Sequence, residues 1–400
     1  MAEGRTRPAW AEVDVSAIRH NIGVLRRLVE PAALCAVVKA DAYGHGATAV
    51  GAAAIEGGAA GLAVALVDEG VELRESKITA PILVLSDLPP GGAAKAVAGG
   101  LTPTLSSVEG VEEMVTAARA LGTSHSVHVK LDTGMHRMGA DPQQFFDVVA
   151  AVMSARELRL EGVWTHLAVA DGGTDEDRAF TDLQLDRFDD ALARLASADV
   201  LPPVRHAANT AGAVAWPRSR YDLVRCGLGI YGELPLGAVS SIFGADPGTV
   251  PLRPALSIKA QVVSTRTLDA GERPSYGRLR PLAERSLVAT VPLGYADGLP
   301  RAMFGAGYEV LIGGRRRPLA GMVTMDQIIV DCGPDSTVSV GDEGVLLGSQ
   351  GDEAITADEW ADRLGTISWE VLCGIGPRVP RRLVGGSGPA KWKSARVGSV

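Results

Sequence analysis

Residues 34–67, LCAVVKADAYGHGATAVGAAAIEGGAAGLAVALV, contain the repeating unit that decides the fold. The stretch begins with a short apolar run (34–40), continues through an alanine-rich stretch with helical spacing, and ends in a second apolar run (61–67). Short runs rich in β-branched residues indicate buried strands, and longer alanine-rich runs indicate helices. The stretch therefore predicts a strand, a helix and a second strand.

The same alternation continues to about residue 232 and gives eight candidate strands. The other six are ILVL (82–85), LTPTL (101–105), SVHVKLD (126–132), LEGVWTH (160–166), VRHAANT (204–210) and LVRCGLG (223–229). Eight consecutive strand–helix units over roughly 200–250 residues are typical of a (β/α)₈ TIM barrel. An open doubly wound sheet is the alternative, although it rarely contains eight such units in a row.

The pattern changes after residue 250, where strand-like runs follow one another without helices between them and Gly, Pro and Asp separate them. These runs are ALSIKAQVV (255–263), SLVATVPL (286–293), YEVLIG (308–313), QIIVDC (327–332) and GVLLG (344–348). We therefore predict an α/β protein, a (β/α)₈ barrel followed by a C-terminal mostly-β domain.

The expected domain boundaries follow from these two patterns. Residues 1–15 should form an N-terminal strand associated with the C-terminal domain, 16–245 the barrel, 250–385 the β domain and 386–400 a flexible tail. The stretch 237–251 is interpreted as the connector between the domains.

Composition excludes several classes of partner. The net charge of −8 argues against nucleic acid, and we interpret the basic run Arg315–Arg317 as a solvated turn. The chain has neither an apolar run long enough to span a bilayer nor a signal peptide, so we expect a cytoplasmic protein without a membrane partner. The four cysteines, at positions 35, 226, 332 and 373, lack metal-ligand spacing, and we expect reduced thiols and no metal site.

Polar side chains follow several of the predicted strands, at the end where barrel enzymes place their catalytic groups. They are Lys39, Lys130, Asp132, Arg137, His166, Asn209, Thr210 and Arg225. Each of them alone could be a solvated or a structural residue. Because the carboxyl ends of barrel strands meet on one face, we expect these side chains to converge there.

Lys39 is the most informative of these residues, because it directly follows the apolar run 34–38. Removing a lysine from water favours its neutral amine, which can form a Schiff base. Barrels commonly bind phosphate in the loops after strands seven and eight, where this chain offers Thr210 and the backbone N–H groups of Gly227 and Leu228. A lysine beside a phosphate site suggests pyridoxal 5′-phosphate (PLP). A Schiff-base aldolase remains the alternative at this point.

Ten motifs of the chain, between about residues 8 and 383, resemble those of bacterial alanine racemases and occur in the same order. They are RPAWAEVDVSAIRHN, VVKADAYGHG, KLDTGMHRMG, THLAVAD, HAANTAG, YDLVRCGLGIYG, SYGR, PLGYADGLPR, MDQ and GIGPRVPR. The resemblance implies a homodimer of chains that each have an N-terminal barrel and a C-terminal β domain. It also implies PLP as cofactor and a small amino acid as substrate.

The resemblance implies a role for each catalytic residue. Lys39 should hold PLP as a Schiff base and act as one acid/base, and Tyr276 should be the opposite acid/base, reaching the site from the partner subunit. His166 should hydrogen-bond that tyrosine, and Arg225, braced by His206, should face the pyridine nitrogen. Two bases on opposite faces are the direct way to invert a carbon centre by removing and returning a proton.

The resemblance also implies binding contacts. Arg137 should contact the phenolic oxygen of PLP, the Met325 backbone should help to fix the substrate carboxylate, and Lys130 matches a lysine that is often carbamylated in the family. The other residues expected to bind the cofactor are Tyr43, His206, Asn209, Thr210, Gly227, Leu228 and Trp369. Arg137, Tyr295 and Asp326 are expected to contact the substrate together with Met325.

Two positions depart from the family pattern, and both belong to the expected substrate channel. Trp369 replaces a tyrosine that usually touches the phosphate and narrows the substrate entrance. Met322 replaces an arginine that usually belongs to the network at this entrance, and Asp171 and Arg301 match other members of that network. The changes indicate either neutral drift or an altered substrate preference.

The resemblance leaves several functions to compare. The first is alanine racemisation that supplies D-alanine to peptidoglycan, and the second is racemisation of serine or of a broader range by the same residues. A PLP-dependent decarboxylase, a PLP-carrier protein and an aldolase share the barrel or the lysine. They do not account for Tyr276 within SYGR together with the β domain.

Overall fold

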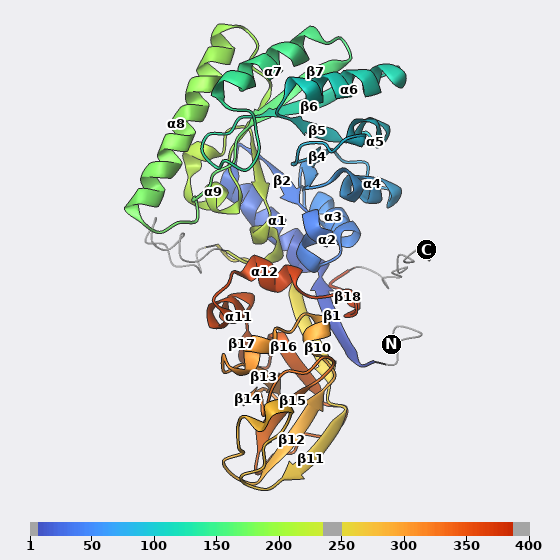
Figure 1. Ribbon diagram of the computed structural model, residues 1–400, viewed down its shortest axis with the longest axis vertical. Helices are drawn as coiled ribbons and strands as arrows, with labels where there is room; N and C mark the ends of the chain where they lie inside the picture. The colour runs from blue at the N-terminus through green and yellow to red at the C-terminus, as the bar shows by residue number, and fades with distance from the viewer. Residues whose placement is uncertain (1–6, 235–249, 387–400) are drawn as a thin grey trace. The chain divides into compact units, whose positions relative to one another are not determined.

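The computed structural model describes residues 7–234 and 250–386 (Figure 1). Contacts divide the chain into two units, Ile18–Pro254 and the combination of Met1–Ala17 with Ala255–Val400. Except for residues 250, 251 and 386, the expected connector (237–251) and flexible tail (386–400) lie outside the described residues. Each unit is described by itself below.

The first unit contains eight parallel strands in the order β8-β7-β6-β5-β4-β3-β2-β9, which confirms the predicted barrel class. The strands are β2 (Ala33–Val37), β3 (Gly61–Val64), β4 (Ile82–Val84), β5 (Thr102–Leu105), β6 (His125–Lys130), β7 (Leu158–Trp164), β8 (Val204–His206) and β9 (Leu223–Cys226). All eight predicted runs contain a strand. Most strands end before the predicted run does, because the last residues of the run already form the loops at the carboxyl ends.

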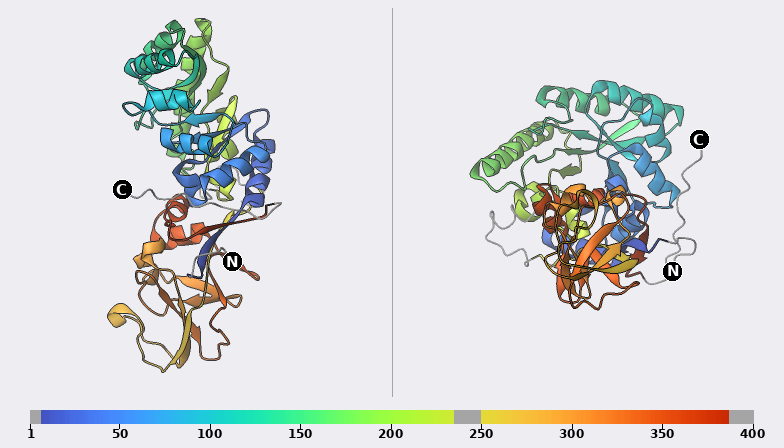
Figure 2. Two further views of the ribbon diagram at one scale, coloured as in Figure 1. Left: turned by 90° about the vertical axis from the view of Figure 1, so that its right-hand side faces the viewer. Right: turned by 60° about the horizontal axis from the view of Figure 1, so that its bottom comes forward.

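Helices lie along the outside of the barrel strands (Figures 1 and 2). They are α1 (Val15–Val29), α2 (Lys39–Gly44), α3 (Ala47–Glu56), α4 (Val67–Glu75), α5 (Gly92–Ala98), α6 (Val108–Ala120), α7 (Pro142–Ser154), α8 (Asp175–Ser197) and α9 (Thr210–Ala215), with 3₁₀ turns η1 (Pro217–Ser219) and η2 (Leu228–Tyr231). Local sequence starts several of them. Asp141 caps α7 ahead of a proline at the first turn, and Thr174 with Asp177 forms a capping box on α8.

The first and last strands of this sheet, β8 and β9, meet at a seam closed by Arg205 and Asp222. The Asp222 backbone N–H donates to the Arg205 carbonyl at 3.0 Å, and the Arg205 N–H donates to the Asp222 carboxylate at 2.8 Å. The Arg205 guanidinium binds both oxygens of the same carboxylate, at 2.5 and 2.7 Å. On the other edge of β9, Ala33 to Ala36 of β2 pair with Leu223 to Cys226.

The second unit contains two sheets. One has seven strands, in the order β14-β13-β16-β10-β1-β18 with β17 paired to β16, and the other has the order β11-β12-β15. The strands are β1 (Ala9–Asp14), β10 (Leu256–Gln261), β11 (Ser264–Leu268), β12 (Ser286–Val291), β13 (Glu309–Ile312), β14 (Arg315–Pro318), β15 (Ile328–Gly333), β16 (Glu343–Gln350), β17 (Glu353–Ile355) and β18 (Arg381–Val384). The remaining named elements are the helices α11 (Ala357–Leu364) and α12 (Ser368–Cys373) and the 3₁₀ turns η4 (Tyr276–Arg278), η5 (Tyr295–Asp297) and η6 (Arg301–Phe304). This confirms the predicted mostly-β domain.

The interpretation of Arg315–Arg317 as a solvated turn was wrong, because these residues begin β14, which pairs with β13. Arg316 forms ion pairs with three acidic side chains, Glu309, Glu353 and Glu359. Two of those partners lie about forty residues away in the sequence, so the run of arginines gave no sign of them. The strand is a charged edge, which discourages pairing with another sheet.

No helix among residues 7–234 and 250–386 is long and apolar enough to cross a membrane. Within the same residues, no group of three or more His, Cys, Asp or Glu side chains could hold a metal ion. Cys35, Cys226 and Cys332 are buried free thiols.

We expect the Asp222→Ala variant to lower the free energy of unfolding by about 1–2 kcal/mol, because it removes the acceptor that joins β8 to β9. Both side chains are about one-third exposed, at 34% and 32%, so solvent limits the loss. Urea denaturation measures it. The matched control is Asp269→Ala, which breaks an exposed ion pair with Arg285 and should change stability by less than about 0.5 kcal/mol. Equal losses in the two variants would contradict the role of the seam.

Candidate functional site

Lys39 begins α2, at the point where the chain leaves β2 in an unusual conformation. Residues 40–43 all have φ between 51° and 54°, the left-handed region, although none of them is glycine. Left-handed backbone costs L-residues roughly 1–2 kcal/mol each. The Glu69 carboxylate accepts the Ala40 N–H at 2.6 Å and the Asp41 carboxylate accepts the Ala47 N–H at 2.7 Å, which holds the turn. Such strain is characteristic of functional sites.

The left-handed turn buries Tyr43 against the loop after β9. The Tyr43 ring packs on Tyr231 with centroids 4.8 Å apart, and the Tyr231 hydroxyl donates to the Val37 carbonyl at 2.9 Å. A Cβ at Gly227 would lie 2.4 Å from the Tyr43 hydroxyl oxygen. Only glycine at position 227 therefore lets this hydroxyl approach the backbone of the loop.

Thr210 joins the same loop from the end of β8. Its hydroxyl accepts the N–H groups of Gly227 at 3.0 Å and Gly229 at 3.3 Å. The side chain of Asn209, the residue before it, caps α9 by accepting the Gly212 N–H at 2.9 Å. Hydroxyl groups and backbone N–H groups that converge around a glycine form a donor set that fits a phosphate ester.

Arg225 of β9 is buried inside the barrel, with 3% of its surface exposed. Its guanidinium donates to His206 Nδ1 at 2.7 Å and to the carbonyls of Thr165 and Ala207, both at 2.9 Å. It also lies over the Trp164 ring, 4.5 Å from the centroid. Burial lowers the Arg225 pKa to about 10, so the group stays charged at neutral pH.

The Arg225 contact fixes the tautomers of two buried histidines. His206 Nδ1 accepts from the arginine, so the proton of neutral His206 sits on Nε2, which lies 2.9 Å from His128 Nδ1. His206 therefore donates to His128. Burial, followed by the charge of Arg225, lowers the pKa of His128 to about 3 and the pKa of His206 well below its ordinary value. Both rings are neutral, and His206 accepts from the arginine while His128 accepts from His206.

His166 is the second histidine against Arg225, since its Nδ1 lies 3.2 Å from the guanidinium. Burial lowers its pKa well below the ordinary value, and the charges of Arg225, Lys130, Arg137 and Lys39 lower it further. The ring is therefore neutral at physiological pH. Because Nδ1 accepts from the arginine, the proton occupies Nε2, which makes that nitrogen a donor.

Lys130, at the end of β6, is 2% exposed and its Nζ lies 4.7 Å above the Trp164 ring. Burial, together with the charges of Arg225 and Arg137, lowers the Lys130 pKa to about 8. At this pKa roughly a tenth of the amine is neutral at pH 7, far more than for a lysine with its ordinary pKa of about 10.4. The exposed Arg137 follows a loop that Asp132 fixes by accepting the N–H groups of residues 134–136.

The second unit presents Tyr276 on a strained turn. The Tyr276 side chain is 72% exposed at the start of η4. The residue before it, Ser275, has a φ of 68°, and its hydroxyl donates to the Met322 carbonyl at 2.7 Å. Tyr276 also lines a pocket with Thr324, Gln327 and Ile329.

The other residues expected to contact the substrate are in the second unit as well. The N–H groups of Tyr295 and Ala296 donate to the carbonyls of Thr324 and Met325, both at 3.0 Å. The side chains of Tyr295 and Met325 are exposed, at 43% and 52%. The half-buried Trp369 lies in α12.

The structure thus brings the expected barrel residues together at one end of the strands and groups Tyr276, Met325 and Tyr295 within the second unit. Sequence analysis missed His128, Trp164 and Tyr231. The alternation of β6 offered a signal for the first, because His128, Lys130 and Asp132 are two residues apart and share one face of a strand.

Comparison with protein families gives two matches that together cover most of the chain. Residues 13–235 match the family described as "Alanine racemase, N-terminal domain", and residues 255–383 match "Alanine racemase, C-terminal domain". The chain belongs to the alanine racemase family. The resemblance inferred from the motifs is therefore confirmed.

Individual relatives agree with this family. A curated alanine racemase from Symbiobacterium thermophilum is 46% identical over 375 residues, covering 94% of this chain and 97% of the relative. One from Carboxydothermus hydrogenoformans is 42% identical, with coverage of 94% and 99%. The crystal structure of an alanine racemase from D-cycloserine-producing Streptomyces lavendulae has a TM-score of 0.88 and 38% identity, with coverage of 96% and 98%.

Membership of the alanine racemase family implies PLP as cofactor and an amino acid as substrate. The residues of the barrel fit such a cofactor. They provide a lysine after a strand, a donor set for a phosphate ester around Gly227, and a buried cation, Arg225, between two neutral histidines.

The neutral buried histidines predict a specific loss of stability in acid. Their folded pKa values are lowered, so below the unfolded value of about 6.5 the unfolded chain binds protons that the folded chain does not. Each such group lowers the free energy of unfolding by about 1.4 kcal/mol per pH unit as the pH falls. His128→Asn removes one such group. We expect the slope of the free energy of unfolding between pH 5 and 6 to fall by about 1.4 kcal/mol per pH unit, as measured by urea denaturation.

The control for that measurement is Val129→Ala in the same strand, which removes buried apolar surface without removing a titrating group. This variant should lower stability equally at both pH values. A slope in His128→Asn that matches the wild-type slope would contradict the lowered pKa of His128.

Proposed function

We propose that this chain is a PLP-dependent alanine racemase that interconverts L-alanine and D-alanine and supplies D-alanine for peptidoglycan. The observation that carries the proposal is the match of both domains to alanine racemases, at up to 46% identity over 94% of the chain among the relatives compared. When bound, PLP supplies an electron-withdrawing ring that makes the α-hydrogen of an amino acid acidic enough for a side chain to remove.

The proposed chemistry uses two bases on opposite faces of the α-carbon. Lys39 would bind the cofactor covalently in the resting enzyme and, as a free amine, move the proton on one face. Tyr276 would move the proton on the other face through its hydroxyl oxygen. His166 supports this assignment, because its Nδ1 accepts from Arg225 and its Nε2 is left as a donor to the tyrosine.

Arg225 would face the pyridine nitrogen of the cofactor. Its guanidinium holds its proton near neutral pH, since burial lowers its pKa only to about 10. With the cofactor bound, the arginine would leave the ring nitrogen unprotonated and make the ring a weaker electron sink, which would favour return of the proton over transamination. The contact from His206 braces the guanidinium in this orientation.

The remaining barrel contacts would bind the cofactor's other groups. We assign the phosphate to the hydroxyls of Tyr43 and Thr210 and the N–H groups of Gly227 and Leu228, with support from Asn209 and from Trp369. Arg137 would contact the phenolic oxygen and the substrate. Lys130 would lie beside Arg137 and carry a carbamate, as the corresponding lysine often does in the family. Its pKa of about 8 supports carbamylation, because the neutral amine is the form that reacts.

The proposal includes a homodimer with shared active sites. Tyr276, Tyr295 and Met325 are exposed in the single chain, as expected for residues that complete the site of a partner subunit. Asp326 would join them at the substrate. We also propose a cytoplasmic location, where reduced thiols persist, and the buried free thiols of Cys35, Cys226 and Cys332 support it.

A second candidate function is racemisation of serine or of a wider set of amino acids. Trp369 and Met322 favour it, because both replace residues of the expected substrate channel. Asp171 and Arg301 match other residues of the same channel. A decarboxylase on the same fold is less well supported, because both halves of the chain match racemases.

The proposed function is tested by following α-hydrogen exchange in D₂O by NMR, with PLP and a panel of L-alanine, D-alanine, L-serine and larger amino acids. We expect exchange and inversion to be fastest for alanine in both directions. Faster inversion of another amino acid would contradict alanine as the substrate. Trp369→Tyr then serves as the test of the channel, since recovery of alanine preference would identify Trp369 as the cause.

The two-base assignment and the shared site predict complementation between inactive variants. Lys39→Ala and Tyr276→Phe should each lose at least about 10³-fold in racemisation rate. When the two are unfolded together and refolded as a mixture, half of the dimers pair unlike chains, and each such dimer has one site with both residues. We expect about a quarter of wild-type activity to return. No recovery would contradict catalysis by Tyr276 from the partner subunit.

A further inference from the structure

Asp297, in the 3₁₀ turn η5, is a buried carboxylate that none of the proposed catalytic steps uses. It is 1% exposed. The Arg7 guanidinium binds both of its oxygens, at 2.7 and 2.5 Å, and Arg378 Nε lies 3.3 Å from Oδ1. The Gly294 N–H donates to Oδ2 at 2.9 Å. A single acidic side chain is thus held by two arginines and one backbone group.

The two arginines come from distant parts of the sequence and also reach a second segment. Arg7 precedes β1, and Arg378 lies between α12 and β18. Arg378 Nη2 donates to the Asp326 carboxylate at 2.6 Å, and Arg7 Nη2 donates to the Asp326 carbonyl at 3.4 Å. Arg7 Nε also donates to the Pro292 carbonyl at 2.9 Å. The cluster therefore joins residues 292–297 to Asp326.

These two segments also meet through their main chains, at the residues assigned to the substrate. The Ala296 N–H donates to the Met325 carbonyl at 3.0 Å. A Cβ at Gly294 would lie 2.3 Å from the Thr324 carbonyl oxygen and 2.4 Å from that of Met325. The close approach needs a glycine, and it fixes the Met325 peptide against the turn that contains Asp297.

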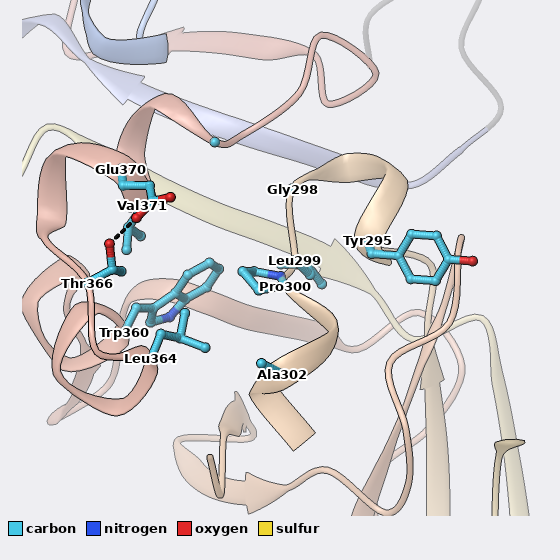
Figure 3. Close-up of a pocket in the computed structure, with 11 residues that line it drawn as sticks. Tyr295, Gly298, Leu299, Pro300, Ala302, Trp360, Leu364, Thr366, Glu370 and Val371 are labelled. Atoms are coloured by element: carbon cyan, nitrogen blue, oxygen red, sulfur yellow. Dashed lines mark hydrogen bonds between the residues drawn. The ribbon is translucent and has the colours of Figure 1, made fainter. Parts of the chain in front are cut away.

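The residues on either side of Asp297 point in different directions. Tyr295, Leu299 and Pro300 all line one pocket with Trp360 of α11, but the Tyr295 ring points away from the other three side chains (Figure 3). The chain after Asp297 is therefore anchored by apolar packing. The carboxylate holds the turn at the point where the chain changes from that packing to the exposed Tyr295.

We propose that Asp297, clamped by Arg7 and Arg378, is a positioning residue that holds the Met325 backbone and the Tyr295 ring for the substrate. The inference rests on the proposed function, because it takes these two residues as contacts of the amino acid. Asp297 does not touch the substrate and acts only through the segments that it joins. The first residues of the described chain thereby contribute to substrate binding through Arg7.

The kinetic test compares Asp297→Asn, Arg7→Ala and Arg7→Lys with Arg285→Ala, which breaks an exposed ion pair in the same unit. We expect KM for L-alanine to rise about tenfold in the first two variants while kcat changes less than about threefold, as when ground-state binding is lost. Arg7→Lys keeps the charge without the two-pronged contact and should fall between them and the wild type. The affinity for PLP should not change, because its proposed barrel contacts, on Tyr43, Thr210 and Gly227, are untouched.

A purely structural ion pair would give another pattern. It would lower the melting temperature and reduce the apparent kcat according to the fraction of unfolded protein, while KM stays unchanged. An unchanged KM in both Asp297→Asn and Arg7→Ala would overturn the proposal, as would an equal rise in Arg285→Ala. Should Asp297→Asn fail to fold, the Arg7 variants decide the question, because the Arg7 side chain is 28% exposed.

Amide hydrogen exchange separates this inference from the proposed function, because it needs no turnover. We expect peptides that cover residues 294–297 to exchange about tenfold faster in Asp297→Asn and Arg7→Ala than in the wild type, and at the wild-type rate in Arg285→Ala. If the wild type does not racemise alanine but this exchange pattern holds, the proposed function fails and the positioning of the segment stands. If the wild type racemises alanine and neither exchange nor KM responds, the inference fails.

Discussion

The buried guanidinium of Arg225 is the constraint around which the polar interior of the barrel is organised. A charge removed from water requires hydrogen-bond acceptors, and here they are two backbone carbonyls and two imidazole nitrogens. No carboxylate within residues 7–234 and 250–386 forms an ion pair with it. A carboxylate would neutralise the field of the arginine, whereas neutral acceptors leave it acting on Lys130 and His166. Burial is the larger cause of their lowered pKa values, and the charge of this cation adds to it.

The sequence predicted the elements whose pattern is local. Most barrel strands are short apolar runs followed by a helix, and this repeating pattern located all eight. The second unit was less predictable, because β1 pairs with β10 and β18, strands more than two hundred residues away. Strand β14 escaped notice for a similar reason, since the glutamates that pair with its arginine are distant in sequence. Helix α11 was not predicted, although its N-cap, Thr356, is a local signal for the start of a helix.

The candidate site shows the same division between local and long-range information. Motifs identified Lys39, Arg225 and Thr210, because each follows or ends a strand that periodicity could find. The left-handed turn at residues 40–43 could not be predicted, since alanine, aspartate and tyrosine ordinarily avoid that conformation. Only the surrounding packing, such as the bond from Ala40 to Glu69, stabilises it. Propensity describes what a segment prefers alone, and this turn exists because tertiary contacts outweigh that preference.

The position of β1 between β10 and β18 has a consequence for biosynthesis. Residues 9–14 leave the ribosome well before their neighbouring strands, 256–261 and 381–384, have been made. At about 5–20 residues per second, the nascent strand waits roughly 10–50 s for β10. During that time the residues of the barrel can fold while an apolar strand has both edges open, a state prone to pairing with other chains. Slow translation or a shortage of chaperones should therefore affect this protein through β1.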